Sequence, residues 1–175
     1  MDMHPLSVCP QLPGLELAVR PIGPEDRAFL FRLYASTRAE ELALTGWDDA
    51  QKDAFLTMQF NAQHSYYQEH YHGAAFDLIL LAGEPVGRMY AARWADQIRI
   101  IDIALLPEHR RRGIGTAFLR AVLAEGERAG LPVTIHVERF NPALRLYHRL
   151  GFRPVADQGV YLLLRWSPEE VRHVG

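Results

Sequence analysis

The stretch that most constrains how this chain can fold runs from Ile98 to Thr116. It begins with a run rich in isoleucine and leucine, typical of a buried β-strand, and continues through Pro107 into three consecutive arginines. Gly113 and Gly115 follow, where a long segment with helical apolar spacing begins. The order predicts a strand, a turn and a helix. Because the unpaired amides and positive dipole of a helix start favour an anion, the stretch also predicts a phosphate-binding loop.

The rest of the chain alternates short apolar strands with amphipathic helices. Seven strands are expected, at 15–20, 76–81, 86–94, 98–106, 133–138, 152–155 and 159–166. Four helices are expected, at about 25–38, 48–71, 115–129 and 141–150. Residues 1–14 are rich in proline and are expected to form an arm ahead of a single domain at 15–170. This order predicts an α/β (α+β) fold, with helices covering a mixed, mostly antiparallel sheet in three layers.

The composition argues against several classes of protein. A formal net charge of −2 speaks against a nucleic-acid protein, which would carry an extended basic surface. No apolar run reaches the roughly 18 residues of a membrane span, and the first residues lack a signal-peptide pattern. Cys9 is the single cysteine, so an intramolecular disulfide is impossible. We therefore expect a cytoplasmic protein that binds neither nucleic acid nor membrane.

A second motif lies downstream of the glycine loop. Asn141 and the proline after it suit a helix start, the predicted helix contains Tyr147, and Gly151 ends it. Taken with the Arg110–Gly115 loop and the order of elements from residue 15 to 166, this segment resembles the GNAT superfamily of acetyl-CoA-dependent N-acetyltransferases. The resemblance covers nearly everything after the arm and implies the three-layer fold of that family.

The resemblance also implies how the donor, acetyl-CoA, would bind. Main-chain amides of the glycine loop would hold the pyrophosphate, through Arg110, Arg111, Arg112, Gly113, Ile114, Gly115 and Thr116. Leu105 and Leu106 would pair their backbone groups with the pantetheine arm, and Asn141 would contact the pantetheine or the acetyl end. Tyr147 would place its hydroxyl beside the sulfur, where a phenol can donate a proton to the departing thiolate.

The group that deprotonates the acceptor amine stays open. In related enzymes that acetylate protein N-termini, a glutamate five residues before the asparagine takes this role, and here that position is His136. An imidazole with an ordinary pKa of about 6.5 can act as a base near neutral pH. Asp102, Glu138 and a water are the alternatives, and Asp102 could instead pair with an arginine or a backbone amide.

The acceptor pocket is less constrained. In the family, the region between the first strand and the hairpin shapes this pocket, which makes Trp47, Phe60, His64 and Tyr67 candidates for its lining. The alternative is that these residues only pack a helix against the sheet. The histidines of this helix lack acidic or cysteine partners at a metal-binding spacing, so no metal site is expected.

The expected function is transfer of an acetyl group from acetyl-CoA to a primary amine, by direct attack in a ternary complex. Tyr147 and His136 are its expected catalytic residues, and a small molecule or a peptide supplies the amine. The alternatives are a non-catalytic module that senses an acyl-CoA or adapts a partner, and transfer of a larger acyl group. Edge strands near the C-terminus are compatible with a homodimer.

Overall fold

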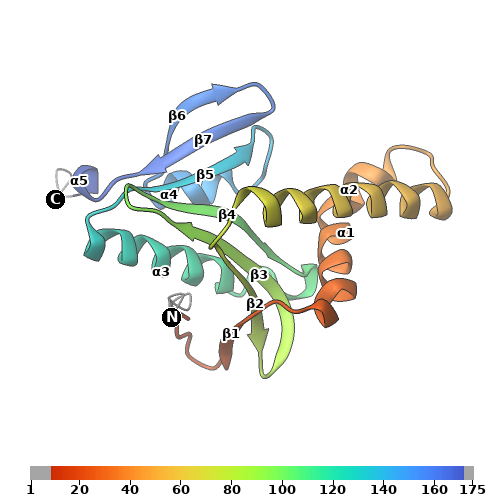
Figure 1. Ribbon diagram of the computed structural model, residues 1–175, viewed down its shortest axis with the longest axis horizontal. Helices are drawn as coiled ribbons and strands as arrows, with labels where there is room; N and C mark the ends of the chain where they lie inside the picture. Colours follow the sequence, from red (N-terminus) through yellow and green to blue (C-terminus); the bar gives the residue numbers. More distant parts are fainter. Residues whose placement is uncertain (1–8, 172–175) are drawn as a thin grey trace.

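The computed structural model describes residues 9–171, in which seven strands form one sheet in the order β1-β2-β3-β4-β5-β7-β6 (Figure 1). The strands are β1 (Leu17–Pro21), β2 (Ala75–Leu81), β3 (Glu84–Arg93), β4 (Ile98–Leu105), β5 (Val133–Glu138), β6 (Arg153–Gln158) and β7 (Tyr161–Trp166). The helices are α1 (Arg27–Ala43), α2 (Asp49–His70), α3 (Ile114–Ala129), α4 (Leu144–Arg149) and α5 (Pro168–Val171), with 3₁₀ turns η1 (Pro24–Asp26) and η2 (Pro107–His109). The predicted fold class is confirmed, and α5 is an element that the sequence did not predict.

Helices cover both faces of the sheet and divide the core into two clusters (Figure 1). On one face, α3 buries a stripe that repeats every four residues and includes Phe118 and Val122. On the other face, α1 and α2 pack against β2 and β3 through residues that include Leu30, Phe60 and Leu78. The molecule therefore has the expected three layers.

The boundaries of α1 differ from the prediction for local reasons. Asp26 does not open the helix, because its two carboxylate oxygens each accept a hydrogen bond of 2.8 Å from Arg20 and one also accepts from the Gly23 amide. Residues 24–26 consequently form a 3₁₀ turn, and α1 begins at Arg27. The helix continues to Ala43 instead of Arg38, because residues 39–43 are strong helix formers.

Smaller differences occur at other element ends. Helix α4 begins at Leu144, after a turn in which the Asn141 side chain accepts a hydrogen bond of 2.8 Å from the Ala143 amide. Residues 9–14 of the expected arm are attached, since Cys9 and Leu12 pack against the α3-side cluster, whereas residues 1–8 lie outside the described part of the chain. None of the described helices is long and apolar enough to cross a membrane.

Strands β4 and β5 separate soon after they meet. They are the one parallel pair among the described strands, and they pair only at Ile98–Val133, Arg99–Thr134 and Ile100–Ile135. A register shift against β3 leaves Ile101 as an extra residue in β4, and such a bulge bends the strand. We call the region beyond Ile100 the β4–β5 opening. It leaves one backbone edge of β4 without a neighbouring strand.

Candidate functional site

The glycine loop presents backbone amides to open space at the start of α3. Gly113 precedes the helix with φ of +82° and no side-chain cap, so the first-turn amides keep their hydrogen-bonding capacity. A Cβ at Gly113 would meet no atom within 4 Å, and one at Gly115 would meet only a Leu105 methyl at 3.8 Å. The side chains of Arg110–Arg112 are exposed beside this space, whereas the Ile114 side chain is buried. The residues present therefore fit a phosphate group.

Strand β4 offers part of its backbone to the β4–β5 opening. The Leu106 amide donates to the Val86 carbonyl at 2.9 Å, and the Leu106 carbonyl accepts from the His109 amide at 3.0 Å. The Leu106 amide is therefore already used within the fold, and this arrangement does not favour the predicted pairing of Leu106 with pantetheine. In an antiparallel ladder hydrogen-bonded and non-bonded pairs alternate, so the amides of Leu105 and Ile103 point into the opening instead. The Leu105 carbonyl accepts from Arg110 Nε at 3.0 Å.

Tyr147 lies on α4 and is 5% exposed, with its ring edge-on to Phe152 at 5.7 Å between centroids. Burial, followed by the charge of Asp102, raises the pKa of Tyr147 above its usual value. The phenol is therefore protonated at neutral pH and can donate a proton or a hydrogen bond. Asn141 is exposed, and its side-chain oxygen is used in the turn that leads into α4.

A cleft of about 500 Å³ lies over the start of the β4–β5 opening, between α1, α2 and the β6–β7 hairpin. It is lined by Tyr34, Arg38, Gln59, Ala62, Gln63, Tyr66, Tyr67, Tyr71, Ile100, Ile101, His136, Gln158 and Tyr161. His136 and Tyr67, two of the candidate site residues, both line this cleft. The other lining residues were missed, although Gln59, Gln63, Tyr67 and Tyr71 recur at the four-residue spacing of one helix face.

Three predicted lining residues lie elsewhere. Trp47 belongs to the α1–α2 connection and packs against Phe55 at 5.3 Å between ring centroids. Phe60 is 2% exposed in the core on the α1–α2 side. His64 stacks on Phe60 and lines a second cavity of about 410 Å³, next to residues 22–24 and Arg27. Phe60 and His64 therefore pack within the fold, as the alternative interpretation of these residues holds, and do not line the cleft.

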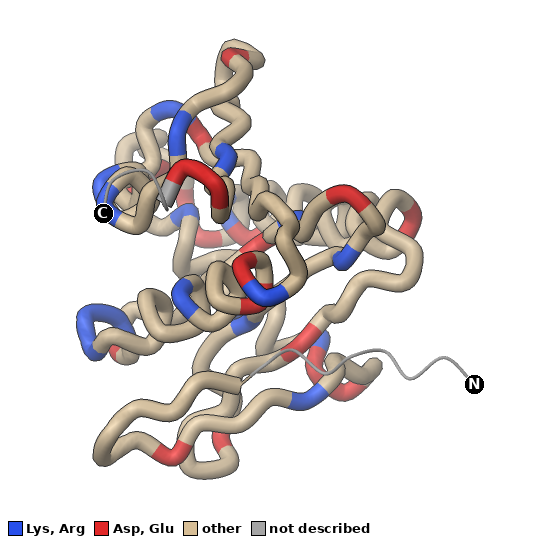
Figure 2. The backbone as a smooth tube through the Cα atoms, turned by 90° about the vertical axis from the view of Figure 1, so that its left-hand side faces the viewer, with Lys and Arg blue, Asp and Glu red and all other residues tan. Residues whose placement is uncertain are grey.

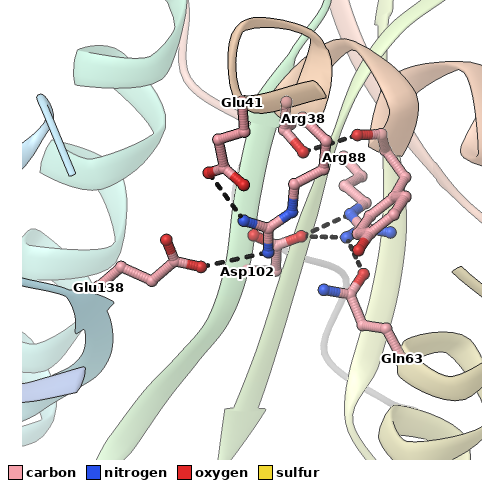
Figure 3. A network of polar contacts seen from close by, with 8 residues as sticks. Arg38, Glu41, Gln63, Arg88, Asp102 and Glu138 are labelled. Carbon is pink, nitrogen blue, oxygen red and sulfur yellow. Dashed lines mark hydrogen bonds and ion pairs between the residues drawn. The ribbon is translucent and has the colours of Figure 1, made fainter. Parts of the chain in front are cut away.

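A network of charged side chains supports the cleft (Figure 3). Arg88 is 3% exposed, and its Nε donates to Asp102 Oδ2 at 2.6 Å while its Nη2 donates to Gln63 Oε1 at 2.8 Å. Burial works against the charged form, but the Asp102 carboxylate more than offsets it, so the pKa of Arg88 lies above its usual value. Asp102 is thus an arginine partner, one of the two roles considered for it.

Glu138 also has an arginine partner. Arg38 donates from Nη2 to Glu138 and from Nη1 to Glu41, each at 3.2 Å (Figure 3). Both carboxylates that were alternatives for the base are therefore hydrogen-bonded to a guanidinium.

The ring of His136 is oriented by Arg99. Nη1 of Arg99 lies 3.3 Å from Nδ1 of His136, and because a guanidinium can only donate, Nδ1 is the acceptor. The proton of the neutral imidazole is then on Nε2. Burial, together with the charge of Arg99, lowers the pKa of His136 below its usual value. With its lone pair engaged, His136 is arranged as a hydrogen-bond donor, and this geometry does not support its predicted role as base.

Two half-buried histidines, His64 and His136, should make the fold sensitive to acid. Burial lowers the pKa values of His64 and His136, so the unfolded chain binds more protons than the folded one as pH falls through about 6.5. Stability should therefore decrease below that pH. We expect the urea midpoint to fall between pH 7.5 and pH 5.5, and to fall less in the double variant His64→Gln/His136→Gln. The exposed His72→Gln should behave like wild type, and an equal fall in the double variant would contradict this assignment.

The distribution of charged residues and the grouping of metal-ligating side chains indicate which kinds of ligand the protein can bind. Lys and Arg positions are interspersed with Asp and Glu positions over the described chain (Figure 2). Among residues 9–171, no three side chains of the His, Cys, Asp or Glu type gather as a metal site would require. The exposed arginines of the glycine loop are therefore a local basic feature.

Comparison with known proteins adds family and fold. The sequence model described as the acetyltransferase (GNAT) family matches residues 27–152. An N-alpha-acetyltransferase of Sulfurisphaera tokodaii is 29% identical over 135 residues, which cover 67% of this chain and 81% of that protein. A mycothiol acetyltransferase of Clavibacter michiganensis is 43% identical over 63 residues, 36% of this chain and 20% of that protein.

Solved structures share the fold at low sequence identity. The PaiA N-acetyltransferase of Thermoplasma acidophilum, in complex with coenzyme A, gives a TM-score of 0.64 at 16% identity, covering 87% of this chain and 99% of that chain. An acetyltransferase of Thermus thermophilus gives a TM-score of 0.62 at 23% identity, and the match covers 87% of this chain and 97% of that chain. Because the family match spans well over half of the 175 residues, the chain belongs to the GNAT family of acetyltransferases.

Proposed function

We propose that this acetyltransferase moves an acetyl group from acetyl-CoA to a primary amine by direct attack, with both substrates bound at once. The observation that carries the proposal is the β4–β5 opening, which has the glycine loop at the end of β4 and the cleft at the start of the opening. Asp102 lies close to both sides: burial, followed by the charge of Asp102, raises the pKa values of both Tyr147 and the cleft residue Tyr67. Donor and acceptor groups can therefore meet on β4.

Different residues of the chain have separate roles in the proposed reaction. Amides of the glycine loop bind the pyrophosphate, the backbone of Leu105 and Ile103 aligns the pantetheine, and Asn141 lies near the acetyl end. Acetyl-CoA supplies the acetyl group as a thioester. Tyr147 keeps its proton at neutral pH and donates it to the departing thiolate. Since Glu138 and Asp102 are paired and the His136 lone pair is engaged, a water in the cleft takes the proton from the acceptor amine.

Two observations favour an amine acceptor and direct attack. The relative from Sulfurisphaera tokodaii is named an N-alpha-acetyltransferase, which supports nitrogen as the attacking atom. Cys9, the single cysteine, packs against the core cluster on the α3 side and is not part of the cleft lining, so no thiol is placed there to form an acetyl-enzyme.

The test is an acetyl-transfer screen. The protein is mixed with acetyl-CoA and representatives of small amines, amino acids and peptides, and both free thiol and acetylated product are measured. Product with at least one amine class, and initial rates that depend on both substrates in a ternary-complex pattern, are expected. Coenzyme A binding without thiol release from any amine would favour the sensing alternative. Faster transfer from succinyl-CoA or a longer acyl-CoA would show that the donor is a larger acyl group.

A charge at Gly115 should separate donor binding from folding. Gly115→Asp places a carboxylate in the first turn of α3, where an acidic residue suits the helix, so the free energy of unfolding should stay within about 1 kcal/mol of wild type. The same carboxylate repels a pyrophosphate, so the Kd for coenzyme A should rise by about tenfold or more. Calorimetric titration and urea denaturation measure the two effects.

The exposed Ala124→Asp, on the same helix but away from the loop, is the matched control and should bind coenzyme A like wild type. An unchanged Kd in Gly115→Asp would remove the glycine loop from the donor site.

A further inference from the structure

Arg99 is a half-buried cation without a carboxylate partner among the described residues. Its Nε donates to Thr134 Oγ1 at 2.8 Å, its Nη1 to His136 Nδ1 at 3.3 Å and its Nη2 to Gln97 Oε1 at 3.4 Å. Its guanidinium also lies 5.3 Å from the centre of the Trp94 ring. All four contacts are neutral, so the positive charge is held in place without being compensated.

The other two arginines around the cleft differ in this respect. Arg38 contacts two glutamates, and Arg88 contacts Asp102. Removing a cation from water is costly unless an anion accompanies it, which explains these pairs. Arg99 is the exception, and it is fixed from three nitrogens, which leaves two of its five N–H groups unused. A guanidinium held in this way is suited to a carboxylate, which it can bind through two parallel hydrogen bonds.

His136 adds a second donor beside Arg99. Because its Nδ1 accepts from Arg99, its other ring nitrogen carries the proton, and His136 lines the cleft. Gln97 Oε1 accepts both from Thr134 Oγ1 at 2.6 Å and from Arg99, so the surrounding side chains are also fixed. Arg99 and His136 together form a pair of preorganised donors. His136 lines the cleft, and Arg99 lies behind this lining, in contact with His136 and with Trp94, the stacking partner of the lining residue Tyr71.

The pair is also at a suitable distance from the reacting groups. In β4, Arg99 is paired with Ala92 and Asp102 with Tyr90, and positions 90 and 92 share one face of β3. Arg99 and Asp102 therefore face the same side of the sheet, separated by at most about 10 Å along the strand. One end of a small molecule can lie near Asp102 and Tyr147 while its other end reaches Arg99.

We propose that the acceptor amine carries a carboxylate, and that Arg99 and His136 bind this carboxylate in the cleft. The inference rests on the proposed amine acetylation and narrows its substrate to amino acids and other amino-carboxylates. Tyr71 stacks on Trp94 with ring centroids 6.2 Å apart and lines the cleft beside this pair, so an organic side chain has an aromatic wall to contact. A peptide with an acidic side chain near its N-terminus offers the same chemistry.

The test compares amines with and without this charge, and each kcat/KM is expressed per unprotonated amine, because a carboxylate raises the pKa of a neighbouring α-amine. Phenylalanine with phenylalaninamide, and methionine with methioninamide, form the small-molecule arm; peptides that begin Met-Glu and Met-Gln form the peptide arm. The carboxylate form should be used with a kcat/KM about tenfold or more above its neutral match. The arm that shows the larger ratio identifies the source of the carboxylate. Equal or better use of the neutral forms in both arms would overturn the proposal.

Variants of Arg99 test whether this residue causes the preference for the carboxylate form. Arg99→Gln should bring the ratio of kcat/KM between the carboxylate form and its neutral match close to one, mainly by raising KM for the carboxylate form. Arg99→Lys should keep part of this preference for the carboxylate form. Arg128→Gln removes the same charge from the exposed end of α3 and should leave the ratio unchanged. A full ratio in Arg99→Gln would assign the carboxylate to another residue and overturn the proposal. Thermal denaturation of each variant confirms that it folds.

Binding separates this inference from the proposed function. Calorimetric titration of phenylalanine and phenylalaninamide into the coenzyme A-saturated protein needs no turnover. Carboxylate-dependent binding that Arg99→Gln abolishes would support the inference even if no acetyl transfer occurred. Acetyl transfer to neutral amines without such binding would support the proposed function and reject the inference. Neither transfer nor binding would reject both.

Discussion

Replacing Tyr147 with phenylalanine is expected to lower kcat by about 10²-fold. An ordinary tyrosine is already protonated at neutral pH, and burial, followed by the charge of Asp102, raises the pKa of Tyr147 further. The hydroxyl can therefore donate a proton as the thiolate departs, and phenylalanine cannot. The ring contact with Phe152 remains in the variant, so folding should be unaffected. Steady-state rates of thiol release, with the best acceptor from the screen, measure the effect.

The affinity for coenzyme A distinguishes this role from a binding role. The Kd of the Tyr147→Phe variant should stay within about twofold of wild type, because one hydroxyl adds little to the contacts of so large a ligand. Thr57→Val, which removes an exposed hydroxyl from α2 outside the cleft lining, is the control and should keep the kcat of wild type. If Tyr147→Phe turned over like wild type, its assignment as proton donor would be wrong.

The segment that we propose binds the donor could be predicted from the sequence as a strand, a turn and a helix, because it is local. One uninterrupted segment forms β4, η2, the glycine loop and α3, and its strand, turn and helix signals follow each other along the chain. Strong local signals also predicted α2 to within one residue at each end, and predicted the bounds of β5. At the start of α2, Asp48 and Gln51 cap each other. The backbone partners of Leu106, Val86 and His109, could not be predicted, because they depend on the strand register and on the η2 turn.

The cleft that we propose for the acceptor could not be predicted in the same way, because distant segments of the chain build it. Tyr34 and Arg38 come from α1, Tyr67 from α2 and Tyr161 from β7. Polar and aromatic residues are mixed around α2, so the sequence of this helix does not show which of its sides faces the sheet. His64, a candidate for the cleft lining, consequently lies at the second cavity instead. The arrangement of His136 depends on Arg99, which reaches it only because β4 and β5 pair in one particular parallel register.

Replacing Arg88 with methionine is expected to lower the free energy of unfolding by about 3 kcal/mol or more. Arg88 is 3% exposed and binds both Asp102 and Gln63. Its loss would leave the carboxylate of Asp102 without its counter-ion beneath the cleft. Urea denaturation at pH 7.5 measures the change. Arg139→Met breaks an exposed pair with Asp157 and should leave the midpoint close to that of wild type.

The double variant Arg88→Met/Asp102→Leu should recover most of the lost stability, because apolar residues of similar volume often replace a buried ion pair at little cost. Failure to recover would mean that Arg88 stabilises the fold through contacts other than Asp102. The folded double variant also tests the chemistry, since it lacks the Asp102 carboxylate. If a water accepts the amine proton, as we propose, acetyl transfer should continue in this variant. A folded double variant without activity would instead make the Asp102 carboxylate part of the proton path.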